Sequence, residues 1–238
     1  MKPLDLDAYP RIVFFAGAGM SAESGVPTYR GKGGIWEQYD YEEYACERAF
    51  RRDPAKVLDF HELRRAKVLD CTPHAGHAQL AALQAARPGV AVVTPNIDGL
   101  LQRAGVAVAA ELHGSLWRLR CERHGVWTDD EAGGYRHRHC MECGAWLRPD
   151  IVWFEDMVDD SVFQRAGQLV AEADLFVSIG TSAVVYPAAG FASLARQRGA
   201  YMIEINPEAT AASNMHDLCL RYPASEALTG AFPVPARG

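Results

Sequence analysis

A chain of 238 residues has room for one full α/β domain with a small insertion and a core of good size. Its 49% hydrophobic and 23% charged residues are ordinary for a soluble globular protein, and the net charge of −6 with only short basic runs argues against a general nucleic-acid binder. The first residues lack the apolar region of a signal peptide and no apolar run could span a bilayer, so we expect a cytoplasmic protein that binds no membrane.

The first predicted element is a strand over residues 12–16, whose continuous apolar run suits a strand buried on both faces of a parallel sheet. It leads into Gly17-Ala18-Gly19 and Ser21, the composition of a tight strand-to-helix turn. Glycines there let backbone N–H groups approach a phosphate, and a helix start adds a favourable dipole. The spacing G-x-G-x5-G departs from the dinucleotide fingerprint G-x-G-x-x-G, so a structural turn in another kind of α/β protein stays open.

Helices and strands alternate along the rest of the chain. Asp53-Pro54 and Thr72-Pro73 start helices that we expect to reach about Val68 and to end before Arg87-Pro88-Gly89. Further strands are predicted at 90–94, 106–112, 174–179 and 201–205, and further helices from 100 and around 188–198. In an open parallel sheet, ligands sit at the carboxyl ends of the strands. The loops that should therefore converge on one crevice are 16–30, 94–98, 113–115, 180–182 and 206–208.

Residues 120–148 lack the aliphatic pattern of the rest of the chain and are rich in cysteine, histidine, glycine and arginine. This change in composition indicates an inserted subdomain. Within it, Cys121-x2-His124-x15-Cys140-x2-Cys143 has the spacing of a zinc ribbon with one cysteine replaced by histidine. Four protein ligands leave no open position, so we expect a structural Zn²⁺ that holds together a segment poor in aliphatic residues. His137 or His139 could take the place of His124, and a ribbon that has lost its metal is the alternative.

Three polar positions are candidates for catalysis. His113 follows a predicted strand, where an imidazole could act as a general base, although a lone histidine can equally be structural. Asn96 and Asp98 lie in a polar loop after a buried strand, but Asp98 could simply cap the next helix. His74 and His77 share a helix face without an evident third metal ligand, so we expect them to be structural or surface residues.

Taken together, these motifs resemble the sirtuins, the family of NAD-dependent protein lysine deacylases. The segment from Gly17 to Arg30 resembles that family's GAGxSxxSGIPxFR stretch, Asn96-Ile97-Asp98-Gly99 its NID loop, and His113-Gly114 its catalytic HG pair. The two later cofactor loops of the family correspond to Gly180-Thr181-Ser182 and Asn206-Pro207-Glu208. The match covers almost the whole chain in the right order, with the Cys/His ribbon where the family carries it.

The resemblance implies a Rossmann-like parallel sheet with a smaller domain made of the zinc ribbon and a helical insertion. The NAD-binding domain would comprise residues 1–40, 72–118 and 149–238, and the small domain residues 41–71 and 119–148. It further implies NAD and acyl-lysine proteins or peptides as partners and leaves the oligomeric state open. The cofactor-binding residues it implies are Gly17, Ala18, Gly19, Ser21, Ala22, Glu23, Tyr29, Arg30, Trp36, Asn96, Ile97, Asp98, Gly180, Thr181, Ser182, Asn206, Pro207, Glu208 and Ala224.

In the implied reaction, the substrate peptide pairs as an added strand with Val152-Trp153-Phe154, and the acyl oxygen attacks the nicotinamide ribose with release of nicotinamide. His113 would then act as general base on the ribose hydroxyls, so that the acyl group passes to the ribose, while Asn96 orients ribose and water. Asp98 would hold the nicotinamide carboxamide. The sequence departs from the family pattern at Pro95, where the family has glutamine, and at Glu155, where it has glycine.

The acidic-acyl branch of the family carries Tyr-x-x-Arg on a helix and a small residue that opens the pocket. Here His61 takes the tyrosine position, Arg64 the arginine position, and Ala45 matches the small residue. Residues at i and i+3 share a helix face, and guanidinium suits a carboxylate. We therefore expect removal of succinyl, malonyl or related acidic groups from a pocket with room for acetyl and other acyl groups, with His61 donating one hydrogen bond when neutral and adding charge when protonated. The alternative is that Arg64-Arg65 is a solvated helix face and His61 fills space.

Two other functions stay open. An NAD glycohydrolase or ADP-ribosyltransferase on the same scaffold would transfer the ribose to water or protein. A non-catalytic NAD sensor would use the ribbon as an interaction surface, and Pro95 and Glu155 could signal that loss of activity.

Overall fold

The computed structural model describes residues 1–29, 33–130, 133–182 and 190–234. Its centre is a parallel six-stranded sheet with the strand order β3-β2-β1-β7-β8-β9. The strands are β1 (Ile12–Ala16), β2 (Val90–Thr94), β3 (Val108–Glu111), β7 (Leu175–Ile179), β8 (Tyr201–Ile205) and β9 (Leu218–Leu220). The sequence analysis predicts the first five, whereas the three-residue edge strand β9 is not among its predictions.

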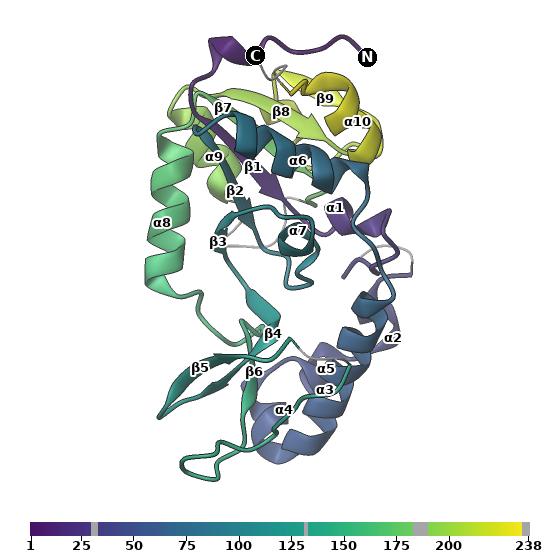
Figure 1. Ribbon diagram of the computed structural model, residues 1–238, viewed down its shortest axis with the longest axis vertical. Helices are drawn as coiled ribbons and strands as arrows, with labels where there is room; N and C mark the ends of the chain where they lie inside the picture. The colour runs from purple at the N-terminus through teal and green to yellow at the C-terminus, as the bar shows by residue number, and fades with distance from the viewer. Residues whose placement is uncertain (30–32, 131–132, 183–189, 235–238) are drawn as a thin grey trace.

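Helices cover both faces of this sheet (Figure 1). Alternate residues of β1 point to opposite faces: Phe14 packs with α6 (Ala75–Ala86) and α10 (Ala224–Ala231), and Phe15 with α8 (Asp160–Ala171) and α9 (Gly190–Gln197). All five residues of β1 are buried, which explains its uninterrupted apolar sequence. The predicted α/β class and parallel sheet are confirmed.

A second, smaller lobe lies below the parallel sheet in Figure 1. Its three-stranded antiparallel sheet has the order β5-β4-β6 and comprises β4 (Gly114–Cys121), β5 (Gly125–Thr128) and β6 (Arg148–Ile151). Against it pack α3 (Tyr41–Tyr44), α4 (Glu47–Arg52) and α5 (Pro54–Leu69), around a separate hydrophobic core. The predicted domain boundaries remain a prediction.

The helix starts follow local sequence. α5 begins as predicted, with Pro54 in its first turn and the Asp53 carboxylate accepting a hydrogen bond from the Lys56 N–H. α6 is capped by His74 instead of Thr72: the His74 ring accepts from the Gly76 N–H, and its other ring nitrogen lies 2.7 Å from the Met20 carbonyl oxygen. His74 and His77 are thus capping residues, in line with their structural interpretation.

The remaining elements are short. They are η1 (Leu6–Ala8), α1 (Gly19–Ala22), α2 (Ile35–Gln38), α7 (Leu100–Arg103) and η2 (Ser213–Met215). Among the described residues, no helix has both the length and the apolar character needed to cross a membrane.

Candidate active site

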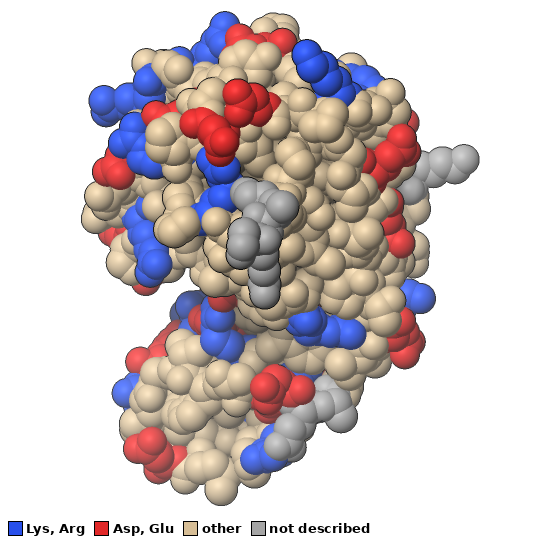
Figure 2. Space-filling model, turned by 45° about the horizontal axis from the view of Figure 1, so that its top comes forward, with Lys and Arg blue, Asp and Glu red and all other residues tan. Residues whose placement is uncertain are grey.

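A cavity of about 790 Å³ lies between the two lobes, where Figure 2 shows the surface notched. The loops after β1, β2, β3, β7 and β8 all reach it, so the predicted convergence of loops on one crevice is confirmed. The predicted site residues that line it are Gly17, Ala18, Gly19, Ala22, Glu23, Tyr29, Trp36, Ala45, His61, Arg64, Asn96, Ile97, His113, Val152, Trp153, Phe154, Gly180, Thr181, Ser182, Asn206, Pro207, Glu208 and Ala224.

Three predicted cofactor residues are not in that set. Ser21 and Asp98 are buried and are not among the residues that line the cavity, and Arg30 lies outside the described residues. The backbone N–H of Leu100 donates to the Asp98 carboxylate over 2.8 Å, so Asp98 caps α7. This is the structural role that the sequence analysis gives as the alternative to a catalytic one. Burial raises the pKa of Asp98 despite the hydrogen bond that its carboxylate accepts from the Leu100 N–H. A direct role of Asp98 toward nicotinamide remains a prediction.

The glycines after β1 have a packing reason of their own. A Cβ on Gly19 would lie 2.6 Å from the Gly180 Cα, and one on Gly17 would lie 2.9 Å from the Gly180 carbonyl oxygen. Gly180 itself has φ +56°, a conformation that side chains rarely adopt. The loops after β1 and β7 therefore meet backbone to backbone at the cavity. The predicted approach of these N–H groups to a phosphate remains a prediction.

His113 lines the cavity at the junction of β3 and β4. Its backbone carbonyl accepts from the Val152 N–H over 3.0 Å, which ties this junction to the end of β6. Burial lowers the pKa of His113, and a hydrogen bond to the Pro95 carbonyl opposes that shift only in part. The ring is therefore neutral near pH 7. With one N–H on a carbonyl, its other nitrogen is available to accept a proton from a group in the cavity.

Asn96 stands beside His113 on the cavity wall and is 5% exposed. Its side-chain amide donates to the Gly17 carbonyl over 2.9 Å, and its backbone N–H donates to the Thr94 hydroxyl. Thr94 in turn donates to the Ala16 carbonyl. These bonds fix the loop after β2 against the glycine loop after β1, so the two loops that resemble cofactor motifs form one rigid wall.

The opposite end of the cavity is formed by the small lobe, where α5 contributes His61 and Arg64. His61 is 1% exposed, and its ring stacks on Trp153 with centroids 6.1 Å apart. Burial, followed by the positive charges of Arg64 and Arg148, places the pKa of His61 well below its usual value. This ring is therefore neutral at physiological pH, so the positive charge that a protonated His61 would add is absent there.

Arg64 faces the cavity and its guanidinium donates to the Tyr29 hydroxyl over 2.7 Å. The guanidinium also lies over the Tyr29 ring, 5.1 Å from its centroid. Among the described residues, no carboxylate lies within ion-pair distance of Arg64. Arg65 is fully buried against Asp129. The alternative that Arg64 and Arg65 form a solvated helix face is thus wrong.

The predicted peptide-binding segment follows β6. The N–H of Val152 donates to the His113 carbonyl, that of Phe154 to the Ala45 carbonyl, and that of Trp153 to the Asp156 carboxylate. A substrate strand that pairs here would therefore have to donate its own N–H groups to carbonyl oxygens of this segment.

The Cys/His ribbon comes together as one cluster in which the donor atoms of Cys121, His124, Cys140 and Cys143 lie within 4.8 Å of one another. Neighbouring donors are 3.3 to 3.8 Å apart. A tetrahedral Zn²⁺ with ligand distances of about 2.0–2.3 Å requires donor separations of about 3.3–3.8 Å, so the set fits a closed, structural zinc site. Neither of the alternatives, His137 and His139, belongs to this cluster, so His124 is its fourth member.

Comparison with known proteins shows which family this chain resembles. A model of the Sir2 family matches residues 17–187. The NAD-dependent protein deacylase 2 of Pyrobaculum aerophilum is 43% identical over 230 residues, which are 96% of this chain and 92% of that protein. The NAD-dependent protein deacylase of Mycolicibacterium paratuberculosis is 42% identical and covers 92% of this chain and 95% of its own. The chain belongs to the Sir2 family.

Solved structures agree with this assignment. The NAD complex of a Sir2 homologue superposes with a TM-score of 0.85 at 39% identity and covers 92% of this chain and 87% of its own. A Sir2 variant in complex with a deacetylated p53 peptide and 3′-O-acetyl ADP-ribose has a TM-score of 0.82 at 28% identity, with coverage of 94% and 92%. The resemblance to the sirtuins is confirmed.

The departures of this Sir2-family chain from the family pattern have local consequences. Pro95 lines the cavity and lacks an N–H, but its carbonyl still holds the ring of His113. Glu155 forms an ion pair with Arg48 over 3.0 Å and is not among the cavity-lining residues, so its charge is directed toward α4. Neither departure disrupts the arrangement around His113.

Several cavity residues escape the sequence analysis. The lining residues that the sequence analysis does not name as site residues are Phe15, Thr28, Pro95, Ile151, Asp156, Val158, Ile205, Ala209, Thr210 and Pro223, of which Thr28 and Pro95 lie in loops predicted to reach the crevice. Ala209 and Thr210 directly follow the predicted loop Asn206-Pro207-Glu208, so a longer loop would have included them. Asp156 accepts a hydrogen bond from Arg148, a contact that no sequence pattern indicates.

Proposed function

We propose that this chain is an NAD-dependent protein lysine deacylase that transfers the acyl group from lysine to ADP-ribose and releases nicotinamide. The observation that carries the proposal is the place of His113: a neutral imidazole on the wall of a cavity that also contains the glycine loop and the Asn206 loop. The names of the relatives and the NAD complex of a homologue support it.

NAD supplies the ribose that accepts the acyl group, and the chain supplies position and proton transfer. His113 would take a proton from a ribose hydroxyl through its free ring nitrogen, with the Pro95 carbonyl holding the ring in place. Asn96, fixed on the Gly17 carbonyl, would keep the loop after β2 in register with the bound nucleotide. The rings of Trp36 and Phe154, whose centroids are 5.5 Å apart, form an aromatic part of the cavity wall.

We also propose that acidic acyl groups, succinyl or malonyl, are preferred. A guanidinium that lines this end of the cavity, with no ion-pair carboxylate among the residues that the structure describes, supports this preference because it is a ready partner for an anion. Ala45 leaves room beside it, and neutral His61 can form the wall or donate one hydrogen bond. The zinc cluster lies outside the cavity and would serve the fold alone.

The test is a panel of otherwise identical lysine peptides that carry acetyl, succinyl, malonyl or crotonyl groups, incubated with the protein with and without NAD. We expect NAD-dependent loss of the acyl mass from the peptide, fastest for succinyl or malonyl, and no loss with His113→Ala. His137→Ala, a change at an exposed histidine in the ribbon lobe, is the matched control and should react normally. Peptides that remain acylated under all conditions would refute the proposal.

A further inference from the structure

One wall of the cavity is a long connection with little regular structure. The chain between β8 and β9 contains only the three-residue η2, yet five consecutive residues of it line the cavity, from Asn206 to Thr210. Side chains on such a segment can bind a ligand in a defined way only if something fixes the course of the backbone. In this structure, hydrogen bonds to a buried carboxylate beneath the loop hold the backbone in place.

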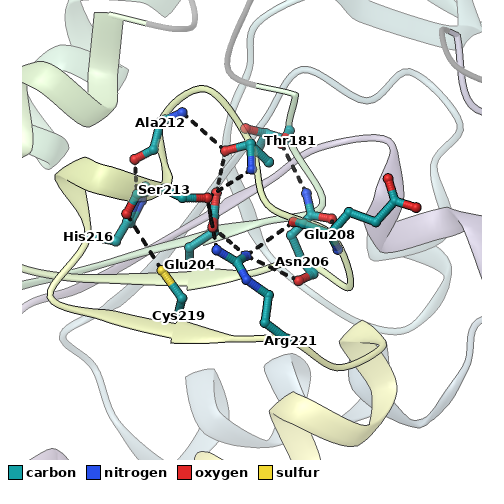
Figure 3. Close-up of polar contacts among 10 residues, drawn as sticks. Thr181, Glu204, Asn206, Glu208, Ala212, Ser213, His216, Cys219 and Arg221 are labelled. Carbon is teal, nitrogen blue, oxygen red and sulfur yellow. Dashed lines mark hydrogen bonds and ion pairs between the residues drawn. The ribbon is translucent and has the colours of Figure 1, made fainter.

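The fixing point is Glu204, near the end of β8, which is 2% exposed (Figure 3). Its carboxylate accepts hydrogen bonds from the hydroxyls of Thr210 and Ser213 and forms an ion pair with Arg221. Burial alone would raise the pKa of Glu204, but the bonds from Ser213, Thr210 and Arg221 outweigh it and lower the pKa. Glu204 is therefore an ionised carboxylate under the loop.

Arg221, just after β9, connects this carboxylate to the backbone of the loop (Figure 3). Its Nη1 lies 3.3 Å from the Asn206 carbonyl oxygen and 3.1 Å from that of Glu208, and its Nη2 donates to the Ser213 hydroxyl over 2.9 Å. The side-chain amide of Asn206 then donates to the Thr181 carbonyl over 3.2 Å. The guanidinium thus holds the backbone at two of the five loop residues that line the cavity.

We infer that Glu204 and Arg221 are positioning residues for the nucleotide: the buried ion pair sets the backbone at Asn206 and Glu208, and these residues contact the adenosine half of NAD. The inference rests on the proposed function for the identity of the ligand. Neither Glu204 nor Arg221 lines the cavity, so both would act through the loop. Removing Arg221 leaves the buried Glu204 carboxylate without its counter-ion, and removing the Glu204 charge releases the Arg221 guanidinium, so either change should displace the loop.

The experiment compares Arg221→Met and Glu204→Gln with the wild type in two assays, steady-state kinetics and ADP-ribose binding by calorimetry. We expect the KM for NAD and the Kd for ADP-ribose to rise at least tenfold in both variants. The KM for the acyl peptide and kcat at saturating NAD should stay within twofold of wild type. Arg221→Lys, which keeps the charge, should recover part of the ADP-ribose affinity.

The matched control is Arg11→Met, which removes an arginine–aspartate pair of 2.8 Å, with Asp174, at the other end of the sheet. Arg11→Met should change neither the KM for NAD nor the Kd for ADP-ribose. If Arg221→Met does not fold, Glu204→Gln and Ser213→Ala carry the test. Unchanged NAD and ADP-ribose constants in the folded variants would overturn the inference, as would an equal loss of kcat and peptide binding. Wild-type protein that fails to bind ADP-ribose would instead overturn the proposed function.

Discussion

Tyr29 and Arg64 come from segments 35 residues apart and meet on the cavity wall. Tyr29 belongs to the stretch that resembles a cofactor motif, whereas Arg64 belongs to α5. Their hydrogen bond orients the guanidinium and also joins the segment after the glycine loop to α5. Each residue could be predicted separately from the motif that contains it, but their contact could not, because it depends on how the two lobes pack.

The first prediction concerns this guanidinium. Arg64→Met should lower the ratio of desuccinylation to deacetylation by about ten- to hundredfold, since a hydrogen bond to a charged group contributes about 1.5–3 kcal/mol. Tyr29→Phe should lower the ratio less, because the guanidinium stays but loses one anchor. The ratio is measured as kcat/KM for two peptides that differ only in the acyl group. An unchanged ratio in Arg64→Met would show that Arg64 does not bind the acyl carboxylate.

The second prediction concerns pH. His61 is neutral above its strongly lowered pKa, so its charge does not change between pH 6 and pH 8.5. The ratio of desuccinylation to deacetylation should then stay constant within about twofold over this range. His113, whose pKa is also lowered by burial, should cause both activities to decline together only below about pH 6.5. A ratio that decreases as pH rises through neutrality would indicate a titrating His61 and contradict its burial.

At the scale of elements, α5 connects the acyl end of the cavity to the zinc ribbon. One side of the helix presents His61 and Arg64 to the cavity. Another presents Arg65, fully buried, to Asp129, with the Tyr135 ring centroid 4.4 Å from the guanidinium. The Glu62 carboxylate accepts from the Tyr135 N–H over 3.0 Å. The position of the proposed acyl pocket would therefore depend on the ribbon segment that contains the Cys/His cluster.

Asp129→Ala tests this connection. It removes the counter-ion of a fully buried guanidinium and should reduce the free energy of unfolding by about 3 kcal/mol, measured by urea denaturation. Asp7→Ala is the matched control, since it breaks the Arg87 ion pair at a carboxylate that is 88% exposed, and should cost less than about 1 kcal/mol. Equal losses in the two variants would mean that the buried pair does not hold α5 to the ribbon.

Some of these strands and helices could be predicted from the sequence, and others could not. The strands at residues 12–16, 90–94, 174–179 and 201–205 could be predicted because central strands of a parallel sheet are apolar throughout. β9 has only three residues at a sheet edge, too few for a periodic pattern. α8 has an amphipathic sequence and an aspartate cap at Asp159 that could have been recognised. The charge of His61 could not, because burial by Trp153 decides it.

For the whole molecule, buried neutral histidines make stability depend on pH. Burial lowers the pKa of His77 to about 3, and that of His61 is also well below its usual value. In the unfolded chain both bind protons near pH 6.5, so below that pH the unfolded state binds more protons than the folded state. The stabilisation is complete above pH 6.5 and declines as pH falls, by up to about 1.4 kcal/mol per pH unit for each histidine.

We therefore expect the free energy of unfolding to be flat from pH 7 to pH 8 and to decrease steeply from pH 6 to pH 4. His77→Gln should reduce the change in unfolding free energy per pH unit by the contribution of one bound proton. His137→Gln, at an exposed site, should leave that pH dependence unchanged. Urea denaturation at half-unit pH intervals measures both. A slope that is the same in His77→Gln and in the wild type would show that His77 is protonated in the folded protein.

The central claim, that His113 directs an acyl group from lysine to ADP-ribose within the cavity between the lobes, is tested most directly by the mass of the nucleotide product. The protein is incubated with NAD and a succinyl-lysine peptide, and the nucleotides are analysed by mass spectrometry. We predict succinyl-ADP-ribose in equal amount to free nicotinamide and deacylated peptide, and none of the three with His113→Ala. Free ADP-ribose together with an unchanged peptide would contradict the account and identify an NAD glycohydrolase.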